Sequence, residues 1–139
     1  MRLWYTIDVT GYSQKPLKDK LGIKLEFTVC ILHAPFGYGK ILGISDFHSE
    51  LAEQSDFIQF FTKENKQLED NFPILKSHLT SSGALWISWP KMSSGVKTDL
   101  NENSIREIGL RNGLVDVKVA AIDDVWSGLK FVFRLTDRS

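Results

Sequence analysis

The hydrophobic pattern divides the chain into short apolar runs separated by stretches with helical spacing. Residues 27–32 and 56–61 are almost continuously apolar, which is typical of strands with both faces covered. Residues 84–89 form a third run of this kind. We expect these runs to be strands of one sheet, with residues 27–32 at its centre.

A helical stripe follows the second apolar run. Four apolar residues recur at steps of four, three and four: Leu68, Phe72, Leu75 and Leu79. This spacing places them on one face of a helix. Pro73 lies inside the stripe and is expected to kink the helix or divide it in two. Ser82 and Gly83 are expected to end it.

Capping signals predict two further helices. Ser13 can cap a short helix that Gly22 ends. Asp99, with Glu102 three residues later, fits a capping box. We therefore expect a helix from Thr98 or Asp99 to just before Gly113.

Two alternating runs stand close together near the end of the chain. The apolar residues of the first run are Val115, Val117, Val119 and Ala121. Those of the second run are Leu129, Phe131, Phe133 and Leu135. The link between the runs is too short for a crossover helix. We therefore expect two antiparallel neighbours at a sheet edge.

Strands and helices thus alternate along residues 1–139, which we interpret as a single domain without linkers or repeats. The alternation favours a three-layer α/β fold with a mostly parallel sheet and a C-terminal antiparallel edge hairpin. Loops that follow parallel strands leave at one edge, where such sheets bind ligands. Four segments are expected to meet there: residues 33–40, 62–65, 90–98 and 123–128.

Composition narrows the classes of partner. The 139 residues carry 17 Lys and Arg against 17 Asp and Glu, so no overall field favours nucleic acid or an acidic membrane. No run is long enough for a membrane helix or a secretion signal, and we expect a cytoplasmic protein. The single Cys30 lies in an apolar run. We expect it to be buried rather than a reactive thiol.

Known catalytic patterns are incomplete. Gly39-Lys40 follows a strand as in a phosphate-binding P-loop, but Ala34 replaces the earlier glycine and Ile41 replaces Ser or Thr. A dinucleotide fingerprint beginning at Gly37 also lacks its third glycine. The three histidines and one cysteine have no metal-ligand spacing, so we predict no metal site. His48 and His78 are expected to be solvated.

The loop after Trp89-Pro90 is the first candidate for a ligand site. Lys91 can present an ammonium group to an anion, and Ser93, Ser94 and the amide of Gly95 can add donors. Alternatively, the loop is an ordered turn in which the serines bond their own backbone and the lysine is solvated. The sequence leaves both interpretations open.

Further candidates lie in two other segments of the same predicted edge. His33 follows an apolar strand, and it either binds a ligand or orders its loop by a hydrogen bond. Asp123 either faces a ligand or caps a turn. Trp126 either stacks on a flat ligand or packs in the core. Ser127 completes this set of candidate ligand-binding residues.

Several unusual short motifs carry a resemblance that covers nearly the whole chain. They are residues 11–17 with residues 20–23, Leu32-His33-Ala34-Pro35, residues 86–91 with Ser93-Ser94-Gly95, and Ala121-Ile122-Asp123 with residues 126–129. In these motifs the chain resembles a bacterial family of short proteins known as domain of unknown function 3052, which implies no activity. The order of elements in the C-terminal half also looks like the Rossmann-like methyltransferase fold.

Three functional hypotheses follow. The first is a non-catalytic binding module of Rossmann-like architecture for a small anionic or nucleotide-like molecule. The second is a divergent methyltransferase-like enzyme, which would need affinity for adenosylmethionine. The third is an assembly protein that forms homo-oligomers through the C-terminal hairpin. The sequence identifies no cofactor, and it predicts neither a nucleic-acid nor a membrane partner.

Overall fold

The chain forms one mixed six-stranded sheet in the order β1-β5-β6-β4-β3-β2. The structure is a computed structural model that describes residues 6–7 and 15–138. The strands are β1 (Thr6–Ile7), β2 (Val29–Leu32), β3 (Ser55–Phe61), β4 (Leu79–Pro90), β5 (Leu114–Ala121) and β6 (Trp126–Phe133). In the described sheet every strand except β6 runs in the same direction. The prediction of a mostly parallel sheet is confirmed.

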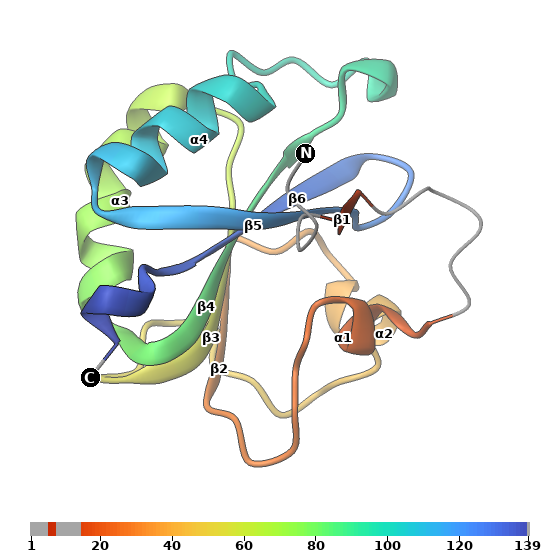
Figure 1. The fold of residues 1–139 in the computed structure, drawn as a ribbon. Coiled ribbons are helices and arrows are strands. Elements are labelled where there is room, and N and C mark those ends of the chain that lie inside the picture. Colours follow the sequence, from red (N-terminus) through yellow and green to blue (C-terminus); the bar gives the residue numbers. More distant parts are fainter. Residues whose placement is uncertain (1–5, 8–14, 139) are drawn as a thin grey trace.

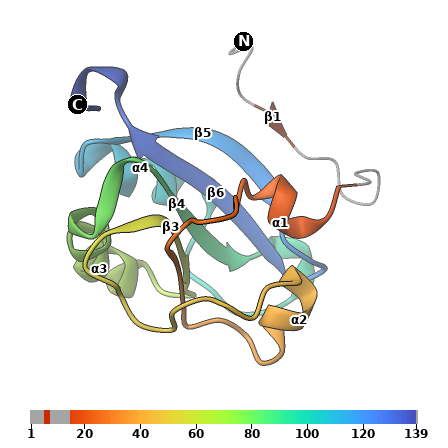
Figure 2. The same ribbon diagram turned by 90° about the horizontal axis from the view of Figure 1, so that it is seen from below.

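Helices cover both faces of this sheet. α3 (Asn65–Ser77) and α4 (Glu102–Arg111) pack on one face, and α1 (Leu17–Lys20) and α2 (Tyr38–Leu42) pack on the other (Figure 1). The view from below shows the same three layers (Figure 2). Each face has its own apolar cluster because every central strand turns side chains to both sides. Short 3-10 turns follow β4 (Met92–Ser94) and β6 (Leu135–Asp137).

The strand β2 lies at one end of the sheet, so its predicted central position is wrong. All four of its residues are buried, as expected. Its outer edge is covered by the chain at His48, which donates its N–H to the Val29 carbonyl at 2.8 Å and accepts from Ile31 N–H at 2.9 Å. An apolar run shows that both faces of a strand are covered. It does not show whether the strand lies at the centre or at the edge of its sheet.

The helix α3 is shorter than predicted and continuous. Pro73 lies inside it without dividing it. Its exposed position lets water reach the carbonyl that it leaves unpaired. The helix ends at Ser77, and Ser82-Gly83 lies within β4 instead of ending the helix. There β4 bulges against β3, and a Cβ on Gly83 would lie 2.8 Å from Thr80 Oγ1.

The helix α4 begins later than predicted. Asn101 caps it, and its side chain accepts from Ser104 N–H at 2.9 Å while Ser104 Oγ accepts from Asn101 N–H at 3.1 Å. Asp99 has another role, since its carboxylate accepts from the backbone N–H of Asn65 at 2.7 Å. Asp99 therefore caps α3 from a distant part of the chain, which local spacing could not reveal.

The C-terminal pair of strands is antiparallel, as predicted. The strand β6 lies between β4 and β5, and β1 pairs with the outer edge of β5 at Lys118 and Val119. A bulge between Asp116 and Lys118 changes which side chains of β5 point inward. Leu114 and Val119 pack in the cluster on the side of α3 and α4, Ala120 packs in the cluster on the other side, and Val115 and Val117 are only half-buried.

Two other expectations concern the ends of the described chain. Leu135 is 78% exposed and lies beyond β6, whereas Leu129 and Phe131 are buried as predicted. Gly22 follows α1 with a φ of +82°, which confirms its role as a helix end. Ser13, the expected cap of that helix, lies outside the described residues. Within the described part of the chain, no helix is long and apolar enough to cross a membrane.

Candidate functional site

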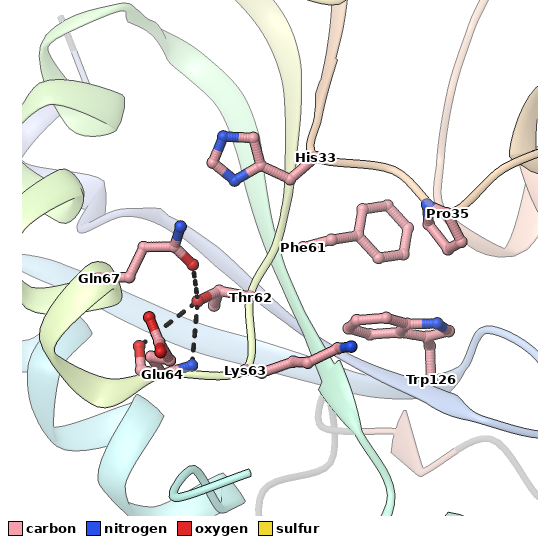
Figure 3. A pocket seen from close by; sticks show the side chains of 8 residues that line it. All are labelled: His33, Pro35, Phe61, Thr62, Lys63, Glu64, Gln67 and Trp126. Carbon is pink, nitrogen blue, oxygen red and sulfur yellow. Dashed lines mark hydrogen bonds between the residues drawn. The ribbon is translucent and has the colours of Figure 1, made fainter. Parts of the chain in front are cut away.

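Three segments distant in sequence meet at the carboxyl ends of β2 and β3 and line an open pocket of about 530 Å³ (Figure 3). They are the loop after β2, the loop from β3 into α3 and the turn between β5 and β6. The lining residues are His33, Pro35, Phe61, Thr62, Lys63, Glu64, Gln67 and Trp126. The predicted convergence of these loops is therefore confirmed. We call this space the rim cavity.

One wall of the rim cavity is apolar. Phe61, the last residue of β3, lies edge-on to Trp126 with their ring centroids 5.1 Å apart. On its other side it contacts Tyr38 of α2 in the same manner at 4.8 Å. Pro35 lies beside Phe61 and Trp126 in Figure 3. Such edge-to-face packing holds the rings in place, so the apolar wall is preorganised.

The opposite wall is polar. The hydroxyl of the buried Thr62 donates to Gln67 Oε1 at 2.5 Å and accepts from Glu64 N–H at 3.3 Å. Lys63 is exposed, and its ammonium group is the only one among the residues lining the rim cavity. Figure 3 shows the three polar side chains of Thr62, Glu64 and Gln67 grouped at one side. This wall therefore offers donors and acceptors opposite the rings.

His33 lies at the mouth of the rim cavity in an uncommon backbone conformation. Its φ is +58°, in the left-handed region that residues other than glycine rarely adopt. Its ring lies 5.0 Å from the ring of Phe60. Strain of this kind often occurs at functional sites. The side chain is placed where a ligand could meet it, and its role stays a prediction.

A chain of buried hydrogen bonds joins α2 to the sheet near the apolar wall. Tyr38 donates its hydroxyl proton to Gln59 Oε1 at 2.9 Å, and Gln59 Nε2 donates to Ser88 Oγ at 3.0 Å. Burial raises the pKa of Tyr38, which keeps the phenol neutral as a donor. The sequence analysis did not predict this network. Its only sign along the chain is that the polar residues Gln59 and Ser88 stand within otherwise apolar runs.

The loop after β4 is an ordered turn outside the rim cavity. Lys91 N–H donates to the Val125 carbonyl at 2.7 Å, so this loop lies beside the β5–β6 turn as expected. Ser94 Oγ donates to the Lys91 carbonyl at 2.6 Å and accepts from Val96 N–H at 3.1 Å. Ser93 is exposed. These contacts match the ordered-turn interpretation.

Gly95 lines a separate groove of about 430 Å³ beneath this turn. The groove is formed by Trp89, Pro90, Met92, Gly95, Val96, Lys97, Thr98, Leu100, Asn101 and Glu102. Neither Lys91 nor the two serines line the rim cavity. Their proposed contact with a ligand therefore stays a prediction.

The turn between β5 and β6 is fixed by Asp123. Its carboxylate oxygen Oδ1 accepts from the N–H groups of Val125 and Trp126, each at 2.8 Å. Asp123 therefore caps the turn and holds Trp126 at the rim cavity. Ser127 pairs with neighbouring strands on both sides of β6. Of the eight candidate residues, the structure brings His33 and Trp126 into the cavity lining.

The lining residues that the sequence did not single out include Thr62, Lys63 and Gln67. The first two belong to a loop that was expected to reach this edge, but nothing in the spacing distinguished their side chains. Gln67 lies on the first turns of α3, and only the direction of that helix brings it to the rim cavity.

Cys30 and the other two histidines, His48 and His78, do not line the rim cavity. Cys30 is buried as predicted and accepts from Ala52 N–H at 3.3 Å. His78 is not simply solvated, since its Nδ1 lies 2.8 Å from the Ala52 carbonyl oxygen. His48 is exposed, in line with its prediction. No group of three or more metal-binding side chains occurs among the described residues.

Comparisons with known proteins show the fold. No family model and no curated protein matches this chain. The ribosomal protein L11 methylase of Lactobacillus delbrueckii subsp. bulgaricus matches with a TM-score of 0.54 and 14% identity, covering 85% of this chain and 75% of that chain. Magnesium protoporphyrin IX methyltransferase from Synechocystis PCC 6803, solved with bound SAH, matches with a TM-score of 0.56 and 13% identity, covering 78% and 74%.

A protein from Pyrococcus horikoshii OT3 matches with a TM-score of 0.59 and 10% identity, covering 86% of this chain and 88% of that chain. At such low identities a match shows the fold alone. This chain therefore has a Rossmann-like, methyltransferase-like α/β fold, as the order of its C-terminal elements indicated.

Proposed function

We propose that the chain is a non-catalytic binding module that takes up a small, nucleotide-like molecule in the rim cavity. The observation that carries this proposal is the pairing of a fixed aromatic wall with a polar wall around one space of about 530 Å³. Cavities of this size, with few polar groups at defined positions, are typical of small-molecule sites. Their place at the carboxyl ends of parallel strands is typical as well.

The aromatic wall favours a flat ligand. Trp126 is only half-buried, so part of its ring remains open to a stacking partner. Phe61 and Asp123 fix it from two directions, through ring packing and through the capped turn. A ring that is already held in place loses little freedom when a ligand binds.

The charges of the lining disfavour a highly charged ligand. Lys63 supplies one ammonium group, whereas Glu64 adds a carboxylate to the same lining. The N-terminus of α3, which often binds phosphate, already has the Asp99 carboxylate on Asn65 N–H. A monophosphate therefore suits the rim cavity better than a triphosphate.

A methyltransferase-like enzyme is the second candidate, and the solved structures are the observation that favours it. Two of the similar structures are of magnesium protoporphyrin IX methyltransferase, with SAH bound in one and SAM in the other. An enzyme of this kind must bind S-adenosylmethionine tightly and transfer its methyl group. The first candidate requires neither property.

Calorimetric titration of the purified chain tests both candidates. The ligands are nucleoside monophosphates, S-adenosylmethionine, its demethylated product, phosphosugars and acyl anions. We expect a monophosphate to bind, and Trp126→Ala to weaken it at least tenfold. Phe36→Ala is the matched control, because Phe36 is fully exposed and does not line the rim cavity. Thermal-shift measurements give a second readout, since ligand at a hundred times its Kd adds about 2.7 kcal/mol of stability.

The lysines are tested in the same titration. Lys63→Ala should weaken an anionic ligand, whereas Lys66→Ala should not, because the Lys66 side chain is 87% exposed and does not line the rim cavity. Lys91→Ala tests the role predicted from sequence. Binding of S-adenosylmethionine together with methyl transfer would replace the first candidate by the second. Absence of binding for every ligand would refute both.

Assembly through the C-terminal hairpin stays a separate proposal. Since β6 is enclosed by β4 and β5, only the outer edge of β5 could pair with a second copy. Part of that edge is already taken by β1. Light scattering at high concentration tests it, and a monodisperse monomer would contradict it. The cytoplasmic location and the resemblance to the bacterial domain of unknown function also stay predictions.

A further inference from the structure

The side-chain amide of Gln67 is held in one orientation at the polar wall. Thr62 Oγ1 lies 2.5 Å from Gln67 Oε1 and 3.4 Å from the Glu64 carbonyl oxygen. The same hydroxyl accepts from Glu64 N–H at 3.3 Å. A threonine hydroxyl has a single proton, and the nearer acceptor is Gln67 Oε1.

With the Thr62 proton donated to Gln67 Oε1, the amide nitrogen of Gln67 is available to bind a ligand. Among residues 15–138, no acceptor is bonded to Gln67 Nε2. Figure 3 shows Nε2 pointing away from Thr62. If the amide were rotated by half a turn, the Thr62 proton would have only the more distant Glu64 carbonyl. The polar wall therefore presents a fixed N–H donor.

The orientation of this donor bears on the kind of ring that can bind. An N–H donor complements a ring that carries a carbonyl oxygen at the point of contact. It opposes a ring that carries an amino group there, because donor then faces donor.

Resting on the proposed binding function, we propose that the rim cavity takes nucleoside monophosphates whose base carries a ring carbonyl, as a 6-oxopurine does, where adenine carries an amino group. The carbonyl oxygen accepts from Gln67 Nε2. The base lies against Trp126, and the phosphate meets the ammonium group of Lys63. Thr62 contributes without touching the ligand, since it positions Gln67.

Inosine 5′-monophosphate and adenosine 5′-monophosphate distinguish this proposal. They share sugar and phosphate and differ at position 6 of the base, where one carries a carbonyl and the other an amino group. We expect the inosine nucleotide to bind roughly ten- to hundredfold more tightly, the range that a mismatched hydrogen bond gives. Calorimetry measures both Kd values.

The substitutions Thr62→Val and Thr62→Ser test the positioning role. Valine has the same shape but no hydroxyl, so the Gln67 amide can rotate and the ratio of the two Kd values should fall toward one. Serine keeps the hydroxyl and should restore the ratio. Urea unfolding of each variant shows that it is folded. A ratio that is the same in wild type and Thr62→Val would overturn the role of Thr62.

The outcomes also separate this inference from the proposed function. If both nucleotides bind equally well and Trp126→Ala weakens both, the rim cavity binds nucleotides but the base selection is wrong. Tighter binding of the adenosine nucleotide has the same meaning. If neither nucleotide binds to the wild-type chain, the selection and nucleotide binding are both overturned.

Discussion

The contact between Gly109 and Phe131 offers a strong test of how α4 packs on the sheet. Gly109 is buried in the last turn of α4, and a Cβ atom built on it would lie 2.0 Å from Cε1 of Phe131. Two further ring atoms would lie at 2.6 Å. Phe131 cannot simply move aside, because it is fully buried and packs edge-on against Phe72 with a centroid distance of 5.4 Å. Gly109 therefore permits the close approach of helix and sheet.

Two opposing effects decide the result of Gly109→Ala. Alanine favours a helix interior over glycine by about 1 kcal/mol. Carbon atoms pack at roughly 3.5–4.0 Å, so α4 or the Phe131 ring must shift by more than an ångström. Overpacking of a tight core costs about 1–3 kcal/mol or more. Since this overlap is severe and the ring is confined, we expect an overpacking cost of about 3–4 kcal/mol and, after the gain in helix propensity, a net loss of about 2–3 kcal/mol.

Urea unfolding followed by circular dichroism measures this loss of free energy of unfolding. Thermal unfolding gives a second readout: at roughly 3–5 °C per kcal/mol for a domain of this size, the melting temperature should fall by about 6–15 °C. The double variant Gly109→Ala/Phe131→Leu removes ring atoms from the overlap and should lose less than the sum of its two single variants. A Gly109→Ala chain as stable as wild type would refute the packing described for α4.

Three further predictions concern stability. Asp116→Ala should cost about 2–4 kcal/mol, because it removes the buried partner of Arg106 Nε at 2.8 Å. Asn101→Ala should cost about 1 kcal/mol, because it removes the capping box with Ser104. Burial, together with neighbouring positive charges, lowers the pKa of Lys130. Lys130→Met should therefore be more stable than wild type at pH 7, and this gain should fade as pH rises through the lowered pKa and be lost above the ordinary lysine value of about 10.4.

The sign of the Lys130 effect follows from proton linkage. With a folded-state pKa below the unfolded one, the folded chain binds fewer protons between these values, so wild-type stability rises with pH there. Unfolding midpoints at pH 7 and pH 11 measure the effect, and an unchanged difference between wild type and variant would contradict it. Glu107→Ala is the control for Asp116→Ala. Its side chain is 74% exposed, so it should change stability by less than about 0.5 kcal/mol.

The sequence alone determined the layers and most of the strands. Continuous apolar runs predicted β2 and β3 because burial on both faces leaves no polar alternation. The short link before β6 predicted its antiparallel pairing with β5, since no crossover fits in so few residues. Parallel strands also predicted which loops gather at one edge, and three of these four loops line the rim cavity.

Only the tertiary structure decided the order of the strands and the side chains of the site. The edge position of β2 depends on pairing with His48, and the start of α4 depends on Asp99 capping α3 instead of its own helix. Gln67 and Thr62 form the polar wall through one hydrogen bond across the start of α3. The hydrophobic periodicity shows which faces of a helix or strand are covered. The contacts of each side chain depend on hydrogen bonds between distant segments, and no local sequence pattern predicts these bonds.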